Sequence, residues 1–215
     1  MKTILIATHN KAKLEELTLG IINFIKEVKI LNLNDLKIVE DPQETGKTFE
    51  ENAKMKVVYY GNKTGYPTIA DDGGLHIEAL NGEPGVKSKR WLGREASDQE
   101  LILYALEKLN GIPKEKRTAF LKTTLCFYDP STKSLLYETE KIKGYIALKA
   151  SGNPTKGYPF RALFIVEKFS KYYDELTDKE HLEINHRLKA LKRLVRKIKP
   201  ILLYPFAFKL QGYNT

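Results

Sequence analysis

The chain has 215 residues, of which 42% are hydrophobic and 29% are charged, and its formal net charge at neutral pH is +9. This composition excludes a disordered chain, and the length is sufficient for one large domain that buries its core without disulfides. The positive charge favours polyanionic partners, namely nucleic acid, acidic lipid or the phosphates of a nucleotide, without choosing among them.

Apolar runs and turn signals in the first third of the chain predict strands that alternate with helices. Thr48 and Glu51 have the spacing of a capping box, which marks a helix start. A helix that begins near Lys11 is expected to carry Leu14, Leu17, Ile21 and Ile22 on its apolar face. In chain order we expect a strand at 3–7, this helix, a strand at 28–31, a polar turn-rich stretch at 35–47, a helix from 49 to about 60 and a strand at 68–70.

The remaining two thirds read as a hairpin-rich block followed by helices. Thr177 and Glu180 form a second capping-box pattern, and Pro200 is expected to end the last helix. We expect a hairpin around 81–82, a helix at 97–109, paired strands at 118–128 and 135–149, a strand at 163–166 and a helix at 186–199. The pattern predicts an α/β fold with an elongated, mixed sheet, in which residues 1–199 form one domain and 200–215 an apolar tail.

The cysteine content and the apolar runs bear on where the protein works. Cys126 has no partner for an internal disulfide, so we expect a buried core side chain in a reducing, cytoplasmic setting. The apolar start of the chain is too short for a signal peptide, and no run approaches the ~20 residues of a membrane span. We therefore expect no membrane partner.

Three polar clusters stand at expected element ends. Thr8-His9-Asn10 with Lys13 opens a helix, where free N–H groups bind phosphate, although a plain N-cap by Asn10 explains the same residues. Asp71-Asp72-Gly73-Gly74 is expected to follow a strand. Two adjacent carboxylates suit Mg²⁺, and the alternative is a surface turn. Asn185-His186-Arg187 opens the last helix, where Arg187 would clamp a phosphate unless the cluster only caps the helix.

The order and spacing of these clusters resemble those of the inosine/xanthosine triphosphate pyrophosphatases. The resemblance covers roughly residues 1–198 and is carried by Thr8 to Lys13, Thr48 to Ala53, Ala70 to Leu75, Ala79 to Ser88 and His186-Arg187. It implies two lobes around a central nucleotide cleft, a homodimer and dependence on Mg²⁺. It also implies hydrolysis of the α–β phosphoanhydride of aberrant purine triphosphates (ITP, XTP, dITP) to monophosphate and pyrophosphate.

The resemblance assigns roles to individual residues. Asp72 matches the proton acceptor and metal ligand, with Asp71 beside it as a second candidate metal ligand. The substrate-binding residues expected on this basis are Thr8, His9, Asn10, Lys13, Gly73, Tyr158, Phe160, Arg161, His181, His186 and Arg187.

The chain also departs from the family pattern. Gly73 stands where the family often has Ser, and Gln43 aligns with a metal-binding Glu, so either Glu44 takes over that position or metal binding rests on Asp72. At the base pocket, Arg161 replaces an Asp and His181 a Lys, while Tyr158 and Phe160 keep rings that would stack on a base. A guanidinium donates where a carboxylate accepts, so the base preference is left open.

Two alternatives follow from these departures and from the charge. One is a pyrophosphatase for other modified nucleotides, as in the distantly similar septum-inhibitor-like family. The other is a non-enzymatic nucleotide- or nucleic-acid-binding protein. Two carboxylates would repel a bare phosphate, so the Asp71-Asp72 pair argues against the second alternative, and we do not expect a nucleic-acid partner.

Overall fold

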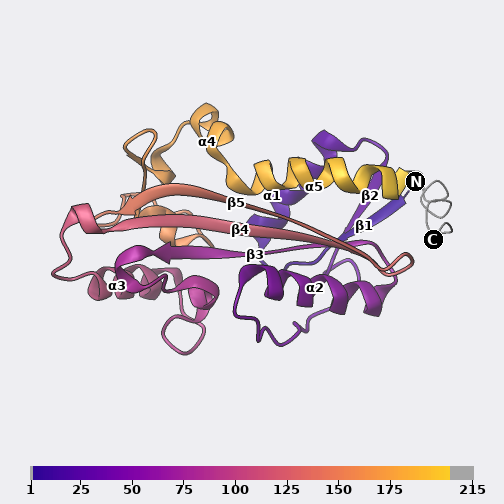
Figure 1. The fold of residues 1–215 in the computed structure, drawn as a ribbon, viewed down its shortest axis with the longest axis horizontal. Helices are drawn as coiled ribbons and strands as arrows, with labels where there is room; N and C mark the ends of the chain where they lie inside the picture. Colours follow the sequence, from indigo (N-terminus) through magenta and orange to yellow (C-terminus); the bar gives the residue numbers. More distant parts are fainter. Residues whose placement is uncertain (1, 204–215) are drawn as a thin grey trace, which may run out of the picture.

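The computed structural model describes residues 2–203, which form one seven-stranded sheet with helices on both faces (Figure 1). The strand order is β2-β1-β3-β4-β5-β6-β7. The strands are β1 (Lys2–Ile6), β2 (Val28–Asn32), β3 (Thr68–Ile77), β4 (Thr118–Asp129), β5 (Ser134–Ile146), β6 (Phe164–Val166) and β7 (Lys171–Tyr172). The helices are α1 (Lys11–Phe24), α2 (Phe49–Thr64), α3 (Asp98–Lys108), α4 (Asp178–Ile184) and α5 (His186–Leu203).

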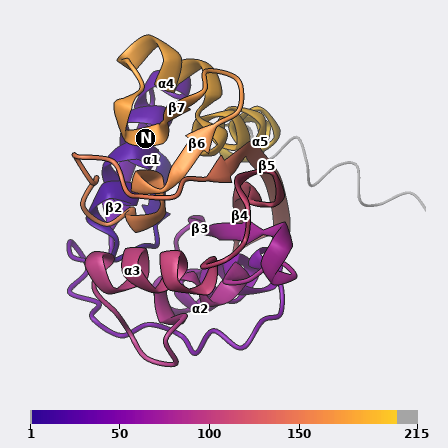
Figure 2. The same cartoon turned by 90° about the vertical axis from the view of Figure 1, so that its left-hand side faces the viewer.

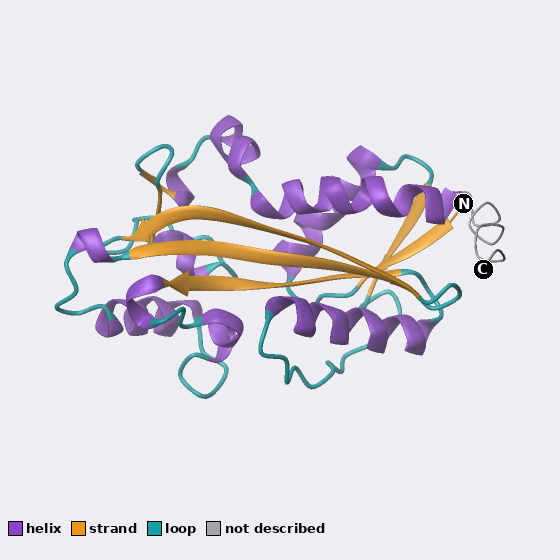
Figure 3. Ribbon diagram, viewed as in Figure 1, coloured by secondary structure: helices purple, strands orange, loops and turns teal. Residues whose placement is uncertain are grey.

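The sheet is mixed, as the sequence predicts. Strand β1 pairs in parallel with β2 and β3, whereas β3, β4 and β5 form a long antiparallel ribbon that runs the length of the molecule (Figure 3). Helices α1 and α5 lie on one face of this ribbon and α2 and α3 on the other (Figures 1 and 2). The elongated α/β architecture is therefore confirmed.

Strand β3 is longer than the sequence predicts, and this moves the acidic cluster. The pairing with β4 continues past Asp71 to Ile77, so the Asp-Asp-Gly-Gly run lies inside a strand and not after one. Glycine makes this possible at residue 73, where a Cβ atom would lie 2.4 Å from the carbonyl oxygen of Lys122 on β4. The two strands approach too closely there for any side chain.

The buried apolar side chains fall into three clusters. One joins α1 and α5 to the sheet, and a second joins α2 to the opposite face, where Cys126 is 1% exposed. Burial raises the pKa of the Cys126 thiol to about 12, which confirms a core role for this side chain. The third cluster lies at the end of the sheet that carries α3, between this helix and the short helix η4 (Pro159–Ala162).

Helix α1 presents a narrower apolar face than expected. Leu17, Gly20 and Ile21 are buried, whereas Ile22 is 53% exposed and does not belong to the buried stripe. A Cβ atom at Gly20 would lie 2.5 Å from Leu191 Cδ2, so the helix is pressed against α5 at this glycine and Ile22 is turned away.

The capping residues mark the helix starts correctly, whereas proline and glycine are poorer guides to where the helices end. Both predicted capping boxes are present, at Thr48 and at Thr177. Helix α2 continues through Gly61 to Thr64 and closes on Gly65 in the left-handed region. Helix α5 passes through Pro200, which therefore does not end it, because Ile201 and Leu202 remain buried against the core.

Two further expectations are modified. The turn at residues 81–82 is closed by a single bridge between His76 and Pro84 and not by paired strands. Residues 200–203 continue α5, and the remainder of the predicted apolar tail, 204–215, lies outside the described residues. No helix in the described part of the chain is long and apolar enough to cross a bilayer.

Candidate active site

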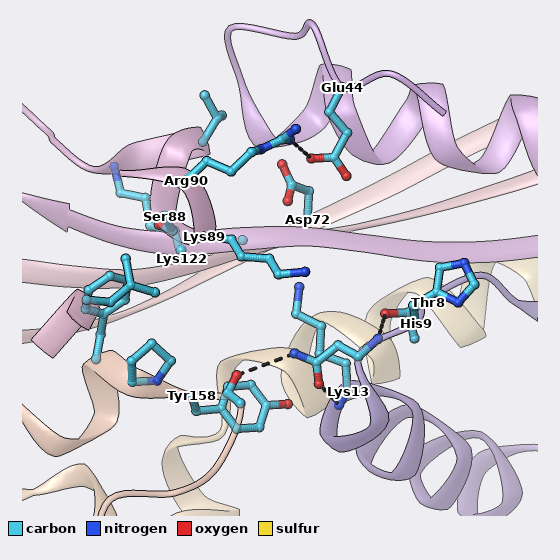
Figure 4. Close-up of a pocket in the computed structure, with 18 of the residues that line it drawn as sticks. Thr8, His9, Lys13, Glu44, Asp72, Ser88, Lys89, Arg90, Lys122 and Tyr158 are labelled. Carbon is cyan, nitrogen blue, oxygen red and sulfur yellow. Dashed lines mark hydrogen bonds and ion pairs between the residues drawn. The ribbon is translucent and has the colours of Figure 1, made fainter. Parts of the chain in front are cut away.

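A cavity of about 430 Å³ lies beside the middle of β3, between the start of α1 and the loop before α2 (Figure 4). Its walls come from the β1–α1 junction, the loop before α2, the middle of β3, the short helix η2 (Gly85–Arg90), η4 and the start of α5. Most of the predicted site residues line it, namely Thr8, His9, Asn10, Lys13, Glu44, Asp72, Gly73, Tyr158, Phe160, Arg161, His186 and Arg187. Asp71 and His181 do not.

The start of α1 forms one wall. The Asn10 side chain caps the helix by accepting from the backbone N–H of Lys13 at 3.1 Å, and Thr8 Oγ1 accepts from the Asn10 N–H at 3.2 Å. The plain capping role is thus observed, and the same residues also face the cavity. His9 Nε2 lies 3.8 Å from Asp41 Oδ1 at the cavity rim. A helix N-terminus with a lysine beside it is suited to an anionic group.

Opposite this wall, two carboxylates share one lysine. Lys56 Nζ lies 2.6 Å from Glu44 Oε1 and 3.7 Å from Asp72 Oδ1. Asn52 Nδ2 donates to Asp72 Oδ2 at 3.1 Å, and Arg90 Nη2 lies 3.1 Å from Glu44 Oε2. Figure 4 shows Asp72, Glu44 and Arg90 on the side of the cavity away from Lys13 and Tyr158.

The electrostatics of this group follow from its burial. Burial raises the pKa of Asp72, and the Glu44 carboxylate adds to that rise against the opposing pull of Lys56. Burial also disfavours the Lys56 ammonium, but Asp72 and Glu44 outweigh it and raise the pKa of Lys56. Asp72 is therefore a carboxylate that accepts a proton more readily than an exposed aspartate.

Asp71 has a different environment because neighbouring residues on a strand point to opposite faces. Its carboxylate lies 3.0 Å from Lys13 Nζ, 2.9 Å from Arg187 Nε and 3.1 Å from Thr123 Oγ1. Lys13 and Arg187 overcome the effect of complete burial and hold the pKa of Asp71 well below its usual range. The structure therefore does not bring Asp71 and Asp72 to one metal position, and Asp71 serves as the counter-ion of two cavity cations.

The far end of the cavity is aromatic and cationic. The Arg161 guanidinium lies 3.6 Å from the Tyr158 ring centroid and 4.6 Å from that of Tyr173. Glu16 connects this group to α5, since its Oε2 accepts from Tyr158 Oη at 3.0 Å and from Arg187 Nη1 at 2.7 Å. Burial would raise the pKa of Glu16, but Arg187 and Arg161 lower it to about 2.

The remaining predicted residues occupy less open positions. His186 is buried, and burial together with Arg187 holds its pKa well below 6.5, so its ring is neutral. Phe160 is only 6% exposed and packs against Trp91, which leaves little of its ring for stacking. His181 packs edge-on against Tyr173, behind the cavity wall.

Sequence reasoning missed three residues at this site, namely Glu16, Asn52 and Lys56. Arg90, for which the sequence leaves open a phosphate contact or a solvated basic edge, pairs with Glu44. A signal existed for two of the three missed residues, because Asn52 and Lys56 are four residues apart beside the buried stripe of α2 and so share one face of the helix. In the loop before α2, Glu44 lines the cavity, whereas Gln43 is exposed and does not.

Comparison with known proteins agrees with this geometry. A sequence profile of the Ham1 family matches residues 4–197. A dITP/XTP pyrophosphatase of Thermoanaerobacter pseudethanolicus is 39% identical over 193 residues, which cover 89% of this chain and 93% of that protein. A protein of the same name from Bacillus subtilis is 38% identical over 200 residues, which cover 90% of this chain and 96% of that protein.

Solved structures show the same fold. A HAM1 protein from Coxiella burnetii superimposes with a TM-score of 0.80 at 32% identity and covers 93% of this chain and 99% of its own. The Ham1 protein of Staphylococcus aureus superimposes with a TM-score of 0.79 at 29% identity and covers 92% of this chain and 98% of its own. With a family profile that spans nearly the whole chain and relatives this similar over almost their full length, the chain belongs to the Ham1 family.

Proposed function

We propose that this protein is a Mg²⁺-dependent nucleoside-triphosphate pyrophosphatase that hydrolyses the α–β phosphoanhydride of aberrant purine nucleotides such as XTP and dITP. One observation carries the proposal: Asp72 and Glu44 face a cavity whose opposite wall is the N-terminus of α1 with Lys13. Acidic and cationic walls on either side of one cavity suit a metal-bound triphosphate. The names of the relatives supply the substrate class.

The donor set fits Mg²⁺. The oxygen ligands would come from Asp72 and Glu44, whose carboxylates both lie close to Lys56 Nζ. Burial raises the pKa of Asp72, and the Glu44 carboxylate adds to this rise while Lys56 and Lys13 oppose it. Within residues 2–203 no three His, Cys, Asp or Glu side chains gather in a metal-binding arrangement. Two carboxylates are what Mg²⁺ takes from a protein when phosphate oxygens and water complete its shell.

The chain's own residues divide the reaction among them. When bound, Mg²⁺ would neutralise charge that develops on the phosphate oxygens. Asp72 orients the attacking water and accepts its proton, for which a raised pKa is suited. The water oxygen forms a bond to the α-phosphorus while the bond to the bridging oxygen breaks, and pyrophosphate leaves. Lys13 and Lys56 stabilise the growing negative charge from opposite walls.

Three further features are proposed from the family resemblance. We propose that residues 1–199 form the catalytic unit, that the protein is a homodimer and that it works in the cytoplasm. Light scattering of the purified full chain would test the dimer, with twice the chain mass of 24.6 kDa expected.

A panel of triphosphates tests the proposed activity. The full chain is incubated with XTP, ITP, dITP, the standard nucleotides and modified pyrimidine triphosphates, with Mg²⁺ or with a chelator, and pyrophosphate is measured. We expect metal-dependent release that is fastest for the deaminated purines. Release confined to modified pyrimidines would favour the alternative of a pyrophosphatase for other modified nucleotides. No release at all, together with salt-sensitive binding to DNA or RNA, would favour a non-enzymatic protein.

A further inference from the structure

Arg161 is a charged side chain whose N–H donors find no hydrogen-bond acceptor in the part of the chain that the structure describes. Its side chain is 11% exposed, yet it makes no hydrogen bond to any of residues 2–203, and its Nη2 is fully buried without a partner. The nearest carboxylate oxygen, Glu16 Oε2, is 3.8 Å from Nη2, which is too far for a hydrogen bond. A buried guanidinium without an acceptor is costly, so its presence beside a ligand cavity calls for an explanation.

The surroundings hold this guanidinium in place. The rings of Tyr158 and Tyr173 pack on it at 3.6 and 4.6 Å from their centroids. Tyr158 is itself tied down, because its hydroxyl donates to Glu16. With the rings against its flat surface, the N–H groups at the edge of the guanidinium are the part left for a ligand.

The two carboxylates nearest to these cations are engaged mainly by residues other than Arg161. They are Asp71 and Glu16, and the cations beside them are Lys13, Arg187 and Arg161. Asp71 is taken by Lys13 and Arg187. Glu16 accepts from Arg187, Tyr158 and Asn185, so little of its capacity remains for Arg161.

The other titratable groups around Arg161 do not accept a hydrogen bond from it. His181 and His186 have pKa values lowered by burial and are neutral. The Asp174 carboxylate accepts from the backbone and the hydroxyl of Thr155, and burial raises its pKa. Arg161 therefore presents a cationic group at the cavity wall whose N–H groups have no hydrogen-bond acceptor among residues 2–203, although Glu16 and Asp174 lie near it.

We propose that Arg161 is the specificity-determining residue at the base end of the cavity, and that its guanidinium selects a xanthine base over a hypoxanthine base. The inference rests on the proposed function and deepens it. Guanidinium is only a donor, so it pairs with base carbonyls and is mismatched with an exocyclic amino group. Xanthine has one carbonyl more than hypoxanthine and loses a proton near neutral pH, so it offers both an additional acceptor and a negative charge.

Paired kinetics with two substrates test this inference. The ratio of kcat/KM for XTP to that for ITP is measured for the wild-type chain, Arg161→Met and Arg161→Lys. We expect Arg161→Met to lower the ratio by about 10- to 100-fold, as loss of a bidentate contact does, and Arg161→Lys to lower it less because the charge remains. Arg94→Met is the matched control, since Arg94 is exposed, pairs with Glu100 and lies outside the cavity.

A second measurement needs no variant. In the wild-type chain the XTP-to-ITP ratio should rise as the pH passes from below to above the pKa of the xanthine base in XTP itself, because only the ionised base gains from the guanidinium charge. A ratio unaffected by pH, or an Arg161→Met chain that loses activity equally on both substrates, would overturn the inference while leaving the pyrophosphatase proposal intact. A wild-type chain inactive on every triphosphate would instead refute the proposed function itself.

Discussion

Arg187 Nε, at the start of α5, lies 2.9 Å from Asp71 Oδ2 in the middle of β3, and both side chains are almost completely buried. The contact joins residues 116 positions apart in the chain. It fixes the cavity cations Arg187 and Lys13 against the sheet, and it separates the role of Asp71 from that of its neighbour Asp72.

This pairing predicts opposite stability effects for two adjacent substitutions. Asp71→Asn leaves Lys13 without its counter-ion and Arg187 with Glu16 alone, so we expect a loss of about 3–5 kcal/mol in the free energy of unfolding. Asp72→Asn removes a carboxylate whose raised pKa marks its charge as unfavourable in the fold, so stability should be unchanged or higher. Urea denaturation of both variants measures this, and an equal loss for the two would contradict the assignment.

The same Asp72→Asn chain tests catalysis. Loss of the proton acceptor should slow pyrophosphate release by roughly 10²–10⁴-fold although the chain stays folded. Unchanged release from this folded variant would exclude Asp72 as the base. The acidic limb of the wild-type pH–rate profile should also have its midpoint at a higher pH than the pKa of an ordinary aspartate, since burial raises the pKa of Asp72.

Glu44 and Gln43 form a matched pair for metal binding. Glu44→Gln removes one of the two proposed metal ligands, so a Mg²⁺ titration of activity should shift to about 10-fold higher concentrations or more. Gln43→Ala alters the exposed neighbour in the same loop and should leave the titration in place. A shift for Gln43→Ala and none for Glu44→Gln would reverse the assignment of the second ligand.

Glu16 should govern part of the stability of the protein in acid. Its pKa falls from 4.5 to about 2 on folding, so its contribution is fully present above pH 4.5 and is lost as the pH falls toward 2. The size of that contribution is roughly 3 kcal/mol from the shift alone. Unfolding free energies measured across this pH range should fall less steeply in Glu16→Gln than in the wild type. Identical slopes would mean that Glu16 is not held as an ion.

Gly73 should tolerate no side chain. A methyl group there would meet the Lys122 carbonyl oxygen at 2.4 Å, so Gly73→Ala should destabilise the fold by about 1–3 kcal/mol and displace the adjacent Asp72. Gly152→Ala is the control, because no atom lies within 4 Å of its Cβ position. Thermal denaturation compares the two, and equal melting temperatures would show that β3 and β4 can part at this point.

Much of the local structure followed from the sequence. The capping boxes at Thr48 and Thr177 marked two helix starts correctly, because the cap is made by residues three positions apart. The helix ends were harder to predict from the sequence. Pro200 reads as a stop, yet α5 continues to Leu203, since burial of Ile201 and Leu202 outweighs the missing hydrogen bond. Periodicity also could not show that Gly20 would draw α1 against α5 and leave Ile22 exposed.

For the site, the sequence alone determined which residue types gather at the element ends: the capping Asn10, the carboxylate of Asp72 and the cation of Arg187. Only the tertiary structure decided their partners. Strand alternation sends Asp71 and Asp72 to opposite faces, and the approach of α2 places Lys56 between Asp72 and Glu44. Arg161 is left without a hydrogen-bond acceptor among residues 2–203 for the same reason, since the acceptors around a cavity come from residues far apart in the chain, which no local pattern encodes.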